Sequence, residues 1–155
     1  MATFIHLADS KKKRLIEKSG IKAGKKGVFS VPVTKAFVTT HQWSRELKRR
    51  GVRSLVCVQF RVSDDETVWV GMYNGEKMSM TAAESVATVA GHTAPMGLEV
   101  IFGRKILPKE IVRIYAAPKI VGWRYYPAAK GKKPFCHCRY CNRGEIRAQR
   151  LIRQD

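Results

Sequence analysis

The sequence lacks long apolar runs, has few acidic residues and carries none of the common motifs of serine or nucleotide-dependent enzymes. No apolar segment approaches the roughly 20 residues that cross a bilayer, and residues 1–14 do not contain the apolar core of a secretory signal. We therefore expect no membrane partner and a cytoplasmic location. The G-x-S-x-G turn, the P-loop and the glycine fingerprint of dinucleotide-binding folds are also absent, which argues against those enzyme classes.

Cysteine is scarce and unevenly placed, since three of the four cysteines, Cys136, Cys138 and Cys141, lie within six residues. This crowding does not indicate a disulfide framework and is typical of a reducing compartment. A closed structural zinc site needs four ligands, so the cluster would require one more from elsewhere in the fold. The candidates for that ligand are His41, Cys57 and His92. Two interpretations of the cluster therefore remain, a zinc site and a group of reduced thiols.

Basic residues far outnumber acidic ones: 30 lysines and arginines against 12 aspartates and glutamates give a net charge of +18. Hydrophobic residues make up 45% of the chain, which is enough for a folded core and excludes a disordered basic tail. The charge exceeds what solubility requires. It favours a polyanionic partner, with nucleic acid as the first candidate.

Positive charge and aromatic side chains coincide in residues 122–155. Between residues 123 and 153 there are nine lysines and arginines and one acidic residue, interleaved with Trp, Tyr and Phe. Aromatic rings stack on bases while basic side chains contact phosphates, so this extension is a predicted nucleic-acid site. The predicted contacts are Trp123, Arg124, Lys130, Lys132, Lys133, Arg139 and Arg143. Alternatively, the extension is a solvated face, and the basic run 11–14 is the next candidate.

Apolar alternation and helical periodicity predict one domain, an α+β core over residues 1–121 with the basic extension 122–155 packed on it. The expected strands cover residues 3–7, 28–31, 54–62, 67–73, 97–101 and 110–116, and the expected helices cover 9–18, 34–50 and 81–91. The third and fourth strands are predicted to pair as a hairpin. Thr81 and Glu84 form a capping-box pattern at the start of the last helix. In the first helix, Leu15 and Ile16 are expected to face inward.

His6 and Glu99 are the candidate functional residues because of their surroundings. His6 ends the first apolar strand and is followed by a charged helix and then Gly20-Ile21. Glu99 lies in an apolar strand, where a buried carboxylate would need a functional or structural reason. Strand alternation alone supports an inward and an outward Glu99 equally.

The order of strand, His, helix and Gly-Ile, followed by a strand, a helix and a late strand with Glu, resembles the ADP-ribosyltransferase superfamily over residues 3–116. The resemblance implies a small split β-sheet that cleaves NAD. It gives His6 a hydrogen bond to the adenine-side ribose and gives Glu99 the stabilisation of the cationic sugar centre. The segment KGVFSVPVTKAF resembles the family's aromatic strand followed by Ser/Thr-x-x-aromatic, which implies Thr34 and Phe37 near nicotinamide. The competitors for that position are Phe29, which is also a cofactor-binding candidate, His41 and Trp43. Trp43 is also expected as a core residue.

The small size and the charge resemble the branch of this superfamily that modifies nucleic acid, in toxin–antitoxin and anti-phage systems. That branch implies NAD as a substrate, RNA in preference to DNA as the acceptor, and an antitoxin protein as a partner. Two other functions stay open. One is a non-catalytic, ribosome-associated RNA-binding module, and the other is an NAD-dependent RNA 2′-phosphotransferase, against which Glu99 argues because that activity normally uses an Arg/His set.

Overall fold

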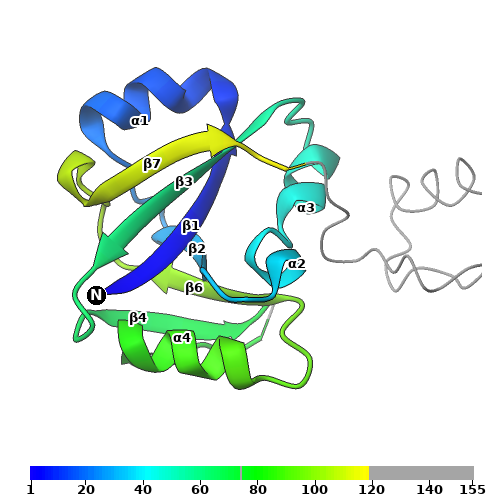
Figure 1. Cartoon of the computed structure of the whole chain (residues 1–155), viewed down its shortest axis with the longest axis vertical. Helices are drawn as coiled ribbons and strands as arrows, with labels where there is room; N and C mark the ends of the chain where they lie inside the picture. Colours follow the sequence, from blue (N-terminus) through cyan, green and yellow to red (C-terminus); the bar gives the residue numbers. More distant parts are fainter. Residues whose placement is uncertain (74, 119–155) are drawn as a thin grey trace, which may run out of the picture.

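In the computed structural model, which describes residues 1–73 and 75–118, seven strands form one antiparallel sheet in the order β5-β4-β6-β2-β1-β3-β7 (Figure 1). The strands are β1 (Ala2–Asp9), β2 (Val28–Pro32), β3 (Leu55–Val62), β4 (Thr67–Met72), β5 (Met78–Thr81), β6 (Leu98–Phe102) and β7 (Ile111–Ala116). The helices are α1 (Lys13–Ser19), α2 (Phe37–Thr40), α3 (Ser44–Arg49) and α4 (Ala82–Gly91), with 3₁₀ turns at Ser10–Lys12 and Pro108–Glu110. The predicted α+β class is confirmed. No helix among the described residues is long and apolar enough to cross a membrane.

The sheet divides between β1 and β2. β1 and β3 pair along eight residues each, whereas β1 and β2 pair only at Phe4–Pro32 and Ile5–Val31. Beyond these two pairs the strands diverge, so β1, β3 and β7 form one half and β2, β6, β4 and β5 form the other. The divergence places the second half of β1 and the first half of β2 on either side of an opening in the sheet.

The predicted hairpin between the third and fourth strands is wrong. β3 pairs with β1 along one edge and with β7 along the other, so it has no edge left for β4. β4 pairs with β5, a strand that the sequence pattern did not predict, and with β6. The turn at 63–66 therefore carries the chain from one half of the sheet to the other. Backbone bonds from Ala83 N to Asp64 O (3.0 Å) and from Ala82 N to Glu66 O (2.8 Å) hold this turn on α4.

α4 begins as predicted. Thr81 is its N-cap and accepts from the Glu84 amide at 3.2 Å, while the Glu84 carboxylate accepts from the Thr81 amide at 2.8 Å. This reciprocal pair satisfies two amides that the first helical turn leaves without partners. α1 begins later than the predicted residue 9, at Lys13, because Asp9 caps a 3₁₀ turn in which its side chain accepts from Lys11 N.

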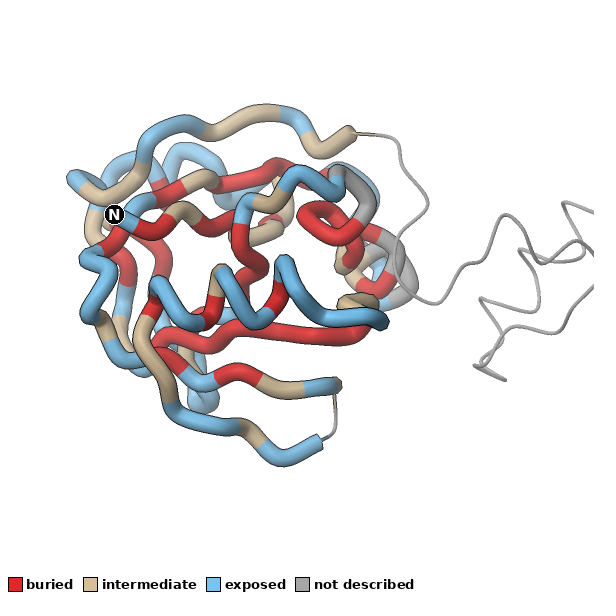
Figure 2. The backbone as a smooth tube through the Cα atoms, turned by 60° about the horizontal axis from the view of Figure 1, so that its bottom comes forward, coloured by how far each residue is buried: buried red, intermediate tan, exposed pale blue. Residues whose placement is uncertain are grey.

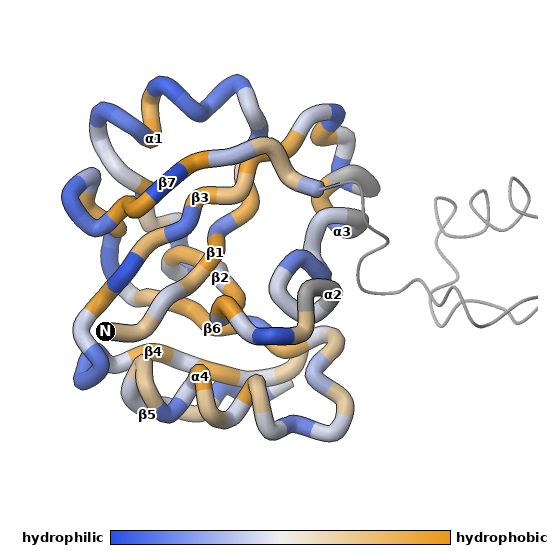
Figure 3. The backbone as a smooth tube through the Cα atoms, viewed as in Figure 1, coloured by the Kyte–Doolittle hydropathy of each residue, from blue (hydrophilic) through white to orange (hydrophobic). Residues whose placement is uncertain are grey.

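α1 buries one side chain of the two that were expected to face inward. Ile16 is buried, whereas Leu15 is 52% exposed, so its predicted inward orientation is wrong. A short helix beside a sheet buries a narrow stripe, and successive residues lie about 100° apart on it, so Ile16 takes the inward position alone. Figure 3 shows α1 as predominantly hydrophilic. Gly20 ends the helix at φ 79°, as the sequence predicts.

The predicted continuous helix over 34–50 is wrong, since the chain forms α2 and α3 with a turn between them. Gln42, fully buried in that turn, explains the break. Its Oε1 accepts from Gly97 N at 2.5 Å, and its Nε2 donates to the Pro95 carbonyl at 3.3 Å. Ser44 Oγ also donates to the His41 carbonyl at 2.9 Å. These bonds replace helical ones and fasten the turn to the loop that precedes β6.

Gln42→Ala is expected to lower the free energy of unfolding by about 2 kcal/mol, because it leaves buried polar groups of Gly97 and Pro95 without partners. Urea unfolding measures the loss. Gln59→Ala is the matched control, since Gln59 makes an exposed bond to Arg113 and its removal should cost less than about 1 kcal/mol. Equal losses in the two variants would contradict the role given to Gln42.

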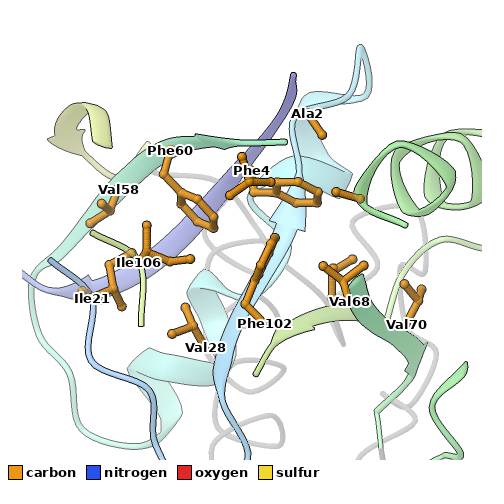
Figure 4. Close-up of a cluster of buried hydrophobic side chains, with 14 of the residues drawn as sticks. Ala2, Phe4, Ile21, Val28, Val58, Phe60, Val68, Val70, Phe102 and Ile106 are labelled. Carbon is orange, nitrogen blue, oxygen red and sulfur yellow. The ribbon is translucent and has the colours of Figure 1, made fainter. Parts of the chain in front are cut away.

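The main core lies on the face of the sheet that α4 covers. Phe4, Phe60 and Phe102 come from β1, β3 and β6, and their ring centroids are 5.0 to 5.9 Å apart (Figure 4). Ala82 and Val89 of α4 join the same buried cluster. Figure 2 shows burial concentrated along the strands, with the outer side of α4 exposed. Phe29, Trp69, Glu99 and Ile101 alternate with the core residues of their strands and therefore lie on the opposite face of the sheet.

Candidate functional site

A cleft of about 1260 Å³ lies where the sheet divides, and both His6 and Glu99 line it. β1 and β2 contribute residues from the two sides of the division, and β6 and β4 contribute the floor. The segment of α2 and α3 adds Thr40, Trp43 and Glu46 to the wall. The structure therefore brings together the two residues that the sequence singled out, although 93 positions separate them.

His6 lies at the point where β1 leaves β2, and its side chain spans the gap. Its Nδ1 is 2.7 Å from the Phe29 carbonyl oxygen. A carbonyl only accepts, so Nδ1 carries the proton and Nε2 of the neutral ring is an acceptor. Burial lowers the pKa of His6, and the bond to Phe29 opposes this shift. The imidazole is therefore neutral at pH 7 with a fixed tautomer.

Glu99 faces the cleft and is 8% exposed, so of the two orientations that the sequence left open, the inward one is observed. In the β4–β6 register it lies opposite Gly71, which has no side chain to cover it. Lys77 Nζ lies 3.0 Å from Glu99 Oε1. A nearly buried carboxylate is stable as an ion only when it is paired in this way.

Lys77 is held by the loop that it follows. Its Nζ donates to the carbonyl of Met72 at 2.6 Å and to the carbonyl of Gly75 at 3.2 Å, in addition to its ion pair. A Cβ at Gly71 would come within 2.8 Å of Lys77 Cδ and would collide with the Glu76 backbone. Glycine at 71 therefore leaves room for the Lys77 side chain to reach Glu99.

Aromatic side chains surround these two residues. Phe29, one of the cofactor-binding candidates, lines the cleft and is 40% exposed. Trp43 lies in the wall, with Nε1 donating to the Leu98 carbonyl at 3.3 Å and its ring 5.9 Å from the ring of Tyr73. Trp69 of β4 also lines the cleft. A planar ring bound beside Glu99 would therefore meet several aromatic faces.

The other two residues implied near nicotinamide have different outcomes. Thr34 is not among the residues that line the cleft, and its hydroxyl donates to the Ala36 carbonyl at 3.2 Å and lies 3.4 Å from the Thr40 hydroxyl. These bonds fix the entry to α2, and the assignment of Thr34 to nicotinamide stays a prediction. Phe37 begins α2, but its side chain lies outside the described part of the structure.

The stretch after Glu99 forms a salt-bridge clamp. The Arg104 guanidinium donates to both Glu110 oxygens, at 2.6 and 2.8 Å, and to Glu66 Oε2 at 2.6 Å. Arg104 holds the pKa of the Glu110 carboxyl below its usual range. Bidentate pairing of this kind fixes geometry as well as charge. The clamp joins the end of β6 to the 63–66 turn and to the 3₁₀ turn before β7, so its role is to position β6.

The remaining candidates fall partly outside the described residues. The predicted nucleic-acid contacts and the cysteine cluster all lie beyond residue 118, so they stay predictions. Within residues 1–73 and 75–118 no group of three or more possible metal ligands occurs. The structure describes the surroundings of the three candidates for a fourth zinc ligand. His41 forms a hydrogen bond with the Tyr115 hydroxyl, His92 accepts a hydrogen bond from Ala94 N, and Cys57 is buried. Burial raises the pKa of the Cys57 thiol to about 11, which also argues against a nucleophilic role.

Sequence patterns missed Lys77, Gly71, Trp69 and Tyr73 as residues of the site. The single available signal was Gly71 inside an alternating strand, which is typical of a close approach of other atoms. Comparisons with models of protein families, with curated proteins and with solved structures find no match.

Proposed function

We propose that this protein is an NAD-dependent ADP-ribosyltransferase that modifies nucleic acid, with RNA favoured over DNA, and acts as a toxin or anti-phage effector. The observation that carries the proposal is that His6 and Glu99, far apart in the sequence, line one cleft at the division of a split sheet. This is the pairing that the resemblance to the ADP-ribosyltransferase superfamily implies. A cytoplasmic location and an antitoxin partner belong to the same proposal.

The residues of the cleft fit NAD as a substrate. Small-molecule sites commonly measure 300–1,000 Å³, so a cleft of about 1260 Å³ has room for a dinucleotide and part of an acceptor. Neutral His6 offers Nε2 as an acceptor for a ribose hydroxyl. Phe29, whose main-chain carbonyl orients His6, offers the face of its ring to the nicotinamide ring.

Glu99 is suited to the bond-breaking step. The bond between nicotinamide nitrogen and ribose C1′ breaks, nicotinamide leaves with the electron pair, and positive charge develops on the ribose. A fixed, nearly buried carboxylate stabilises that charge. A nucleophilic atom of the acceptor then bonds C1′, and its proton passes to Glu99 or to water.

Nicotinamide release tests the proposal. The full chain is incubated with NAD alone and with single-stranded RNA, single-stranded DNA or protein, and free nicotinamide is quantified. The proposal predicts release that RNA or DNA stimulates, accompanied by transfer of the ADP-ribosyl group to the nucleic acid. Stimulation by protein alone would place the acceptor in another class and contradict the nucleic-acid part.

His6→Ala is expected to raise KM for NAD about fivefold with little change in kcat. The hydrogen bond to ribose exists in the ground state and in the transition state alike, and one bond is worth about 1 kcal/mol.

The same role of His6 predicts that the affinity for NAD depends on pH. Because burial lowers the pKa of His6, wild-type affinity stays constant down to about pH 6.5 and falls at lower pH as Nε2 gains a proton.

The pH profile of His6→Asn provides the control, since an amide does not titrate in this range. NAD affinity of this variant should be independent of pH between 5 and 8. A collapsed kcat with an unchanged KM in His6→Ala would instead give His6 a role in the chemical step and contradict the assignment.

A non-catalytic RNA-binding module is the second candidate. Half-exposed Phe29 and Trp69 in a cleft of a chain with charge +18 favour it, because aromatic and basic side chains together bind single-stranded nucleic acid. In such a module Glu99 would have only a structural role, as the ion-pair partner of Lys77. Absence of nicotinamide release with every acceptor would favour this candidate.

A further inference from the structure

Trp69 is an exposed aromatic residue on the floor of the cleft. It lies on β4, lines the cleft and keeps 40% of its surface exposed. Its six-membered ring lies against Gly103, since a Cβ there would come within 2.9 Å of Cζ3 and 3.2 Å of Cη2. The glycine thus allows the ring to extend from β4 across the end of β6, where solvent reaches it.

The sheet register places Trp69 in an apolar row. Trp69 pairs with Ile101 of β6, and Ile101 pairs with Phe29 of β2. Because side chains of directly paired residues project to one face of a sheet, the three form a continuous shelf. Two of its three members are large and 40% exposed.

The shelf lies one step along the strands from Glu99. Glu99 is opposite Gly71, two residues from Trp69 on β4, so Trp69 and Glu99 are diagonal neighbours on the same face. Diagonal positions in an antiparallel pair lie about 7–8 Å apart. A base resting on Trp69 would therefore have its edge beside the carbon at which Glu99 stabilises positive charge.

Two lysines border this shelf. Lys25 and Lys26 occupy a two-residue turn closed by bonds between Gly24 and Gly27 at 3.0 and 3.2 Å, and both line the cleft. Gly27, at φ 102°, packs against the backbone of Phe102, and its Cβ would meet Ile101 Cγ2 at 2.9 Å. The turn is therefore fixed at the end of the shelf with two exposed cations.

We propose that Trp69, at one end of the shelf that it forms with Ile101 and Phe29, stacks on an unpaired nucleobase of single-stranded nucleic acid, while Lys25 and Lys26 contact adjacent phosphates. The inference rests on the proposed function, because it assigns the place of the acceptor in the same cleft. A base inside a duplex cannot stack on a protein ring without leaving its neighbours, so the shelf selects single strands. Uncharged peptides lack the phosphates that two fixed lysines would bind.

Fluorescence anisotropy of labelled single-stranded oligonucleotides, RNA and DNA in separate arms, tests the inference on the full chain without NAD. Trp69→Ala should weaken binding about 5- to 100-fold, the loss typical of one stacked base. Because stacking releases no counterions, that factor should be the same at every salt concentration. Trp69→Phe should retain affinity within about threefold, since it keeps an aromatic face.

The double variant Lys25→Ala, Lys26→Ala should behave differently. Loss of two phosphate contacts should flatten the plot of log affinity against log salt by up to about 1.4 units, at roughly 0.7 per phosphate of a single strand. Met78→Ala is the matched control, because Met78 is a 66% exposed apolar residue of the neighbouring strand, outside the cleft. Its affinity should equal that of the wild type.

Wild-type affinity in Trp69→Ala, with unfolding unchanged, would overturn the inference. So would equal binding of single strands and of duplexes of the same sequence. Preference for RNA or for DNA identifies the acceptor strand and supports the shelf in either case. The binding assay contains no NAD, so its result is independent of the nicotinamide-release assay. Trp69-dependent binding in the first assay, together with no nicotinamide release in the second, would leave this inference standing and refute the transferase.

Discussion

Glu99→Gln is expected to abolish ADP-ribosyl transfer, with kcat lowered about 10²- to 10³-fold. The amide keeps the shape of the carboxylate but removes the negative charge that faces the cationic ribose in the transition state. Loss of one preorganised electrostatic partner typically has a cost of this size. The affinity for NAD should change little, because the positive charge develops only as the bond breaks. Single-turnover kinetics with radiolabelled NAD measure the step directly.

Two controls separate this effect from a general loss of structure. The thermal midpoint of Glu99→Gln should be compared with the wild type, since Lys77 loses its ion-pair partner in the variant. Glu76→Gln removes a charge from an exposed residue of the adjacent loop and should leave kcat unchanged. If Glu99→Gln keeps half of the wild-type rate, Glu99 is a structural residue.

Lys77→Met is expected to lower kcat about 10²-fold while KM for NAD stays near the wild-type value. Lys77 joins Glu99 to two backbone carbonyls of its own loop. Without it, the carboxylate loses its fixed position, and a misplacement of about 1 Å can cost about 10²-fold in rate. Steady-state kinetics give kcat and KM separately.

Lys77→Arg tests whether the cation itself matters, since a guanidinium can still reach the carboxylate and the carbonyls and should restore part of kcat. Lys109→Met serves as the matched control, because Lys109 is exposed and lies outside the cleft. A rise in KM with unchanged kcat in Lys77→Met would show that Lys77 binds NAD and does not position Glu99.

Local patterns in the sequence predicted most of the elements, because alternation and capping depend on neighbouring residues. The strand that carries Glu99 and the helix that begins at Thr81 are examples. Strand pairing depends on distant residues, so the false hairpin of β3 and β4 could not be recognised locally. The break at Gln42 is similar, because its cause is a bond to Gly97, 55 positions away.

The residues of the candidate site were also predictable only where local patterns marked them. His6 was visible because it follows an apolar run, although β1 continues beyond it to Asp9, and Glu99 was visible because it interrupts an apolar strand. Lys77 looked like any surface lysine, since only the register of β4 and β6 and the absence of a side chain at Gly71 bring it to Glu99. Trp69 was not recognised for a related reason. It joins the site only because β6 lies between β4 and β2 in the sheet, although β6 follows both strands in the sequence.

The most direct test of the transferase proposal is mass spectrometry of a single-stranded oligonucleotide after incubation with NAD and the full chain. The proposal predicts a mass gain of one ADP-ribosyl unit with the wild type, accompanied by an equal amount of nicotinamide, and no gain with Glu99→Gln. RNA and DNA strands are tested in parallel. An oligonucleotide that binds the wild type and returns unmodified, with no nicotinamide released, would contradict the proposal and leave the cleft as a site that only binds nucleic acid.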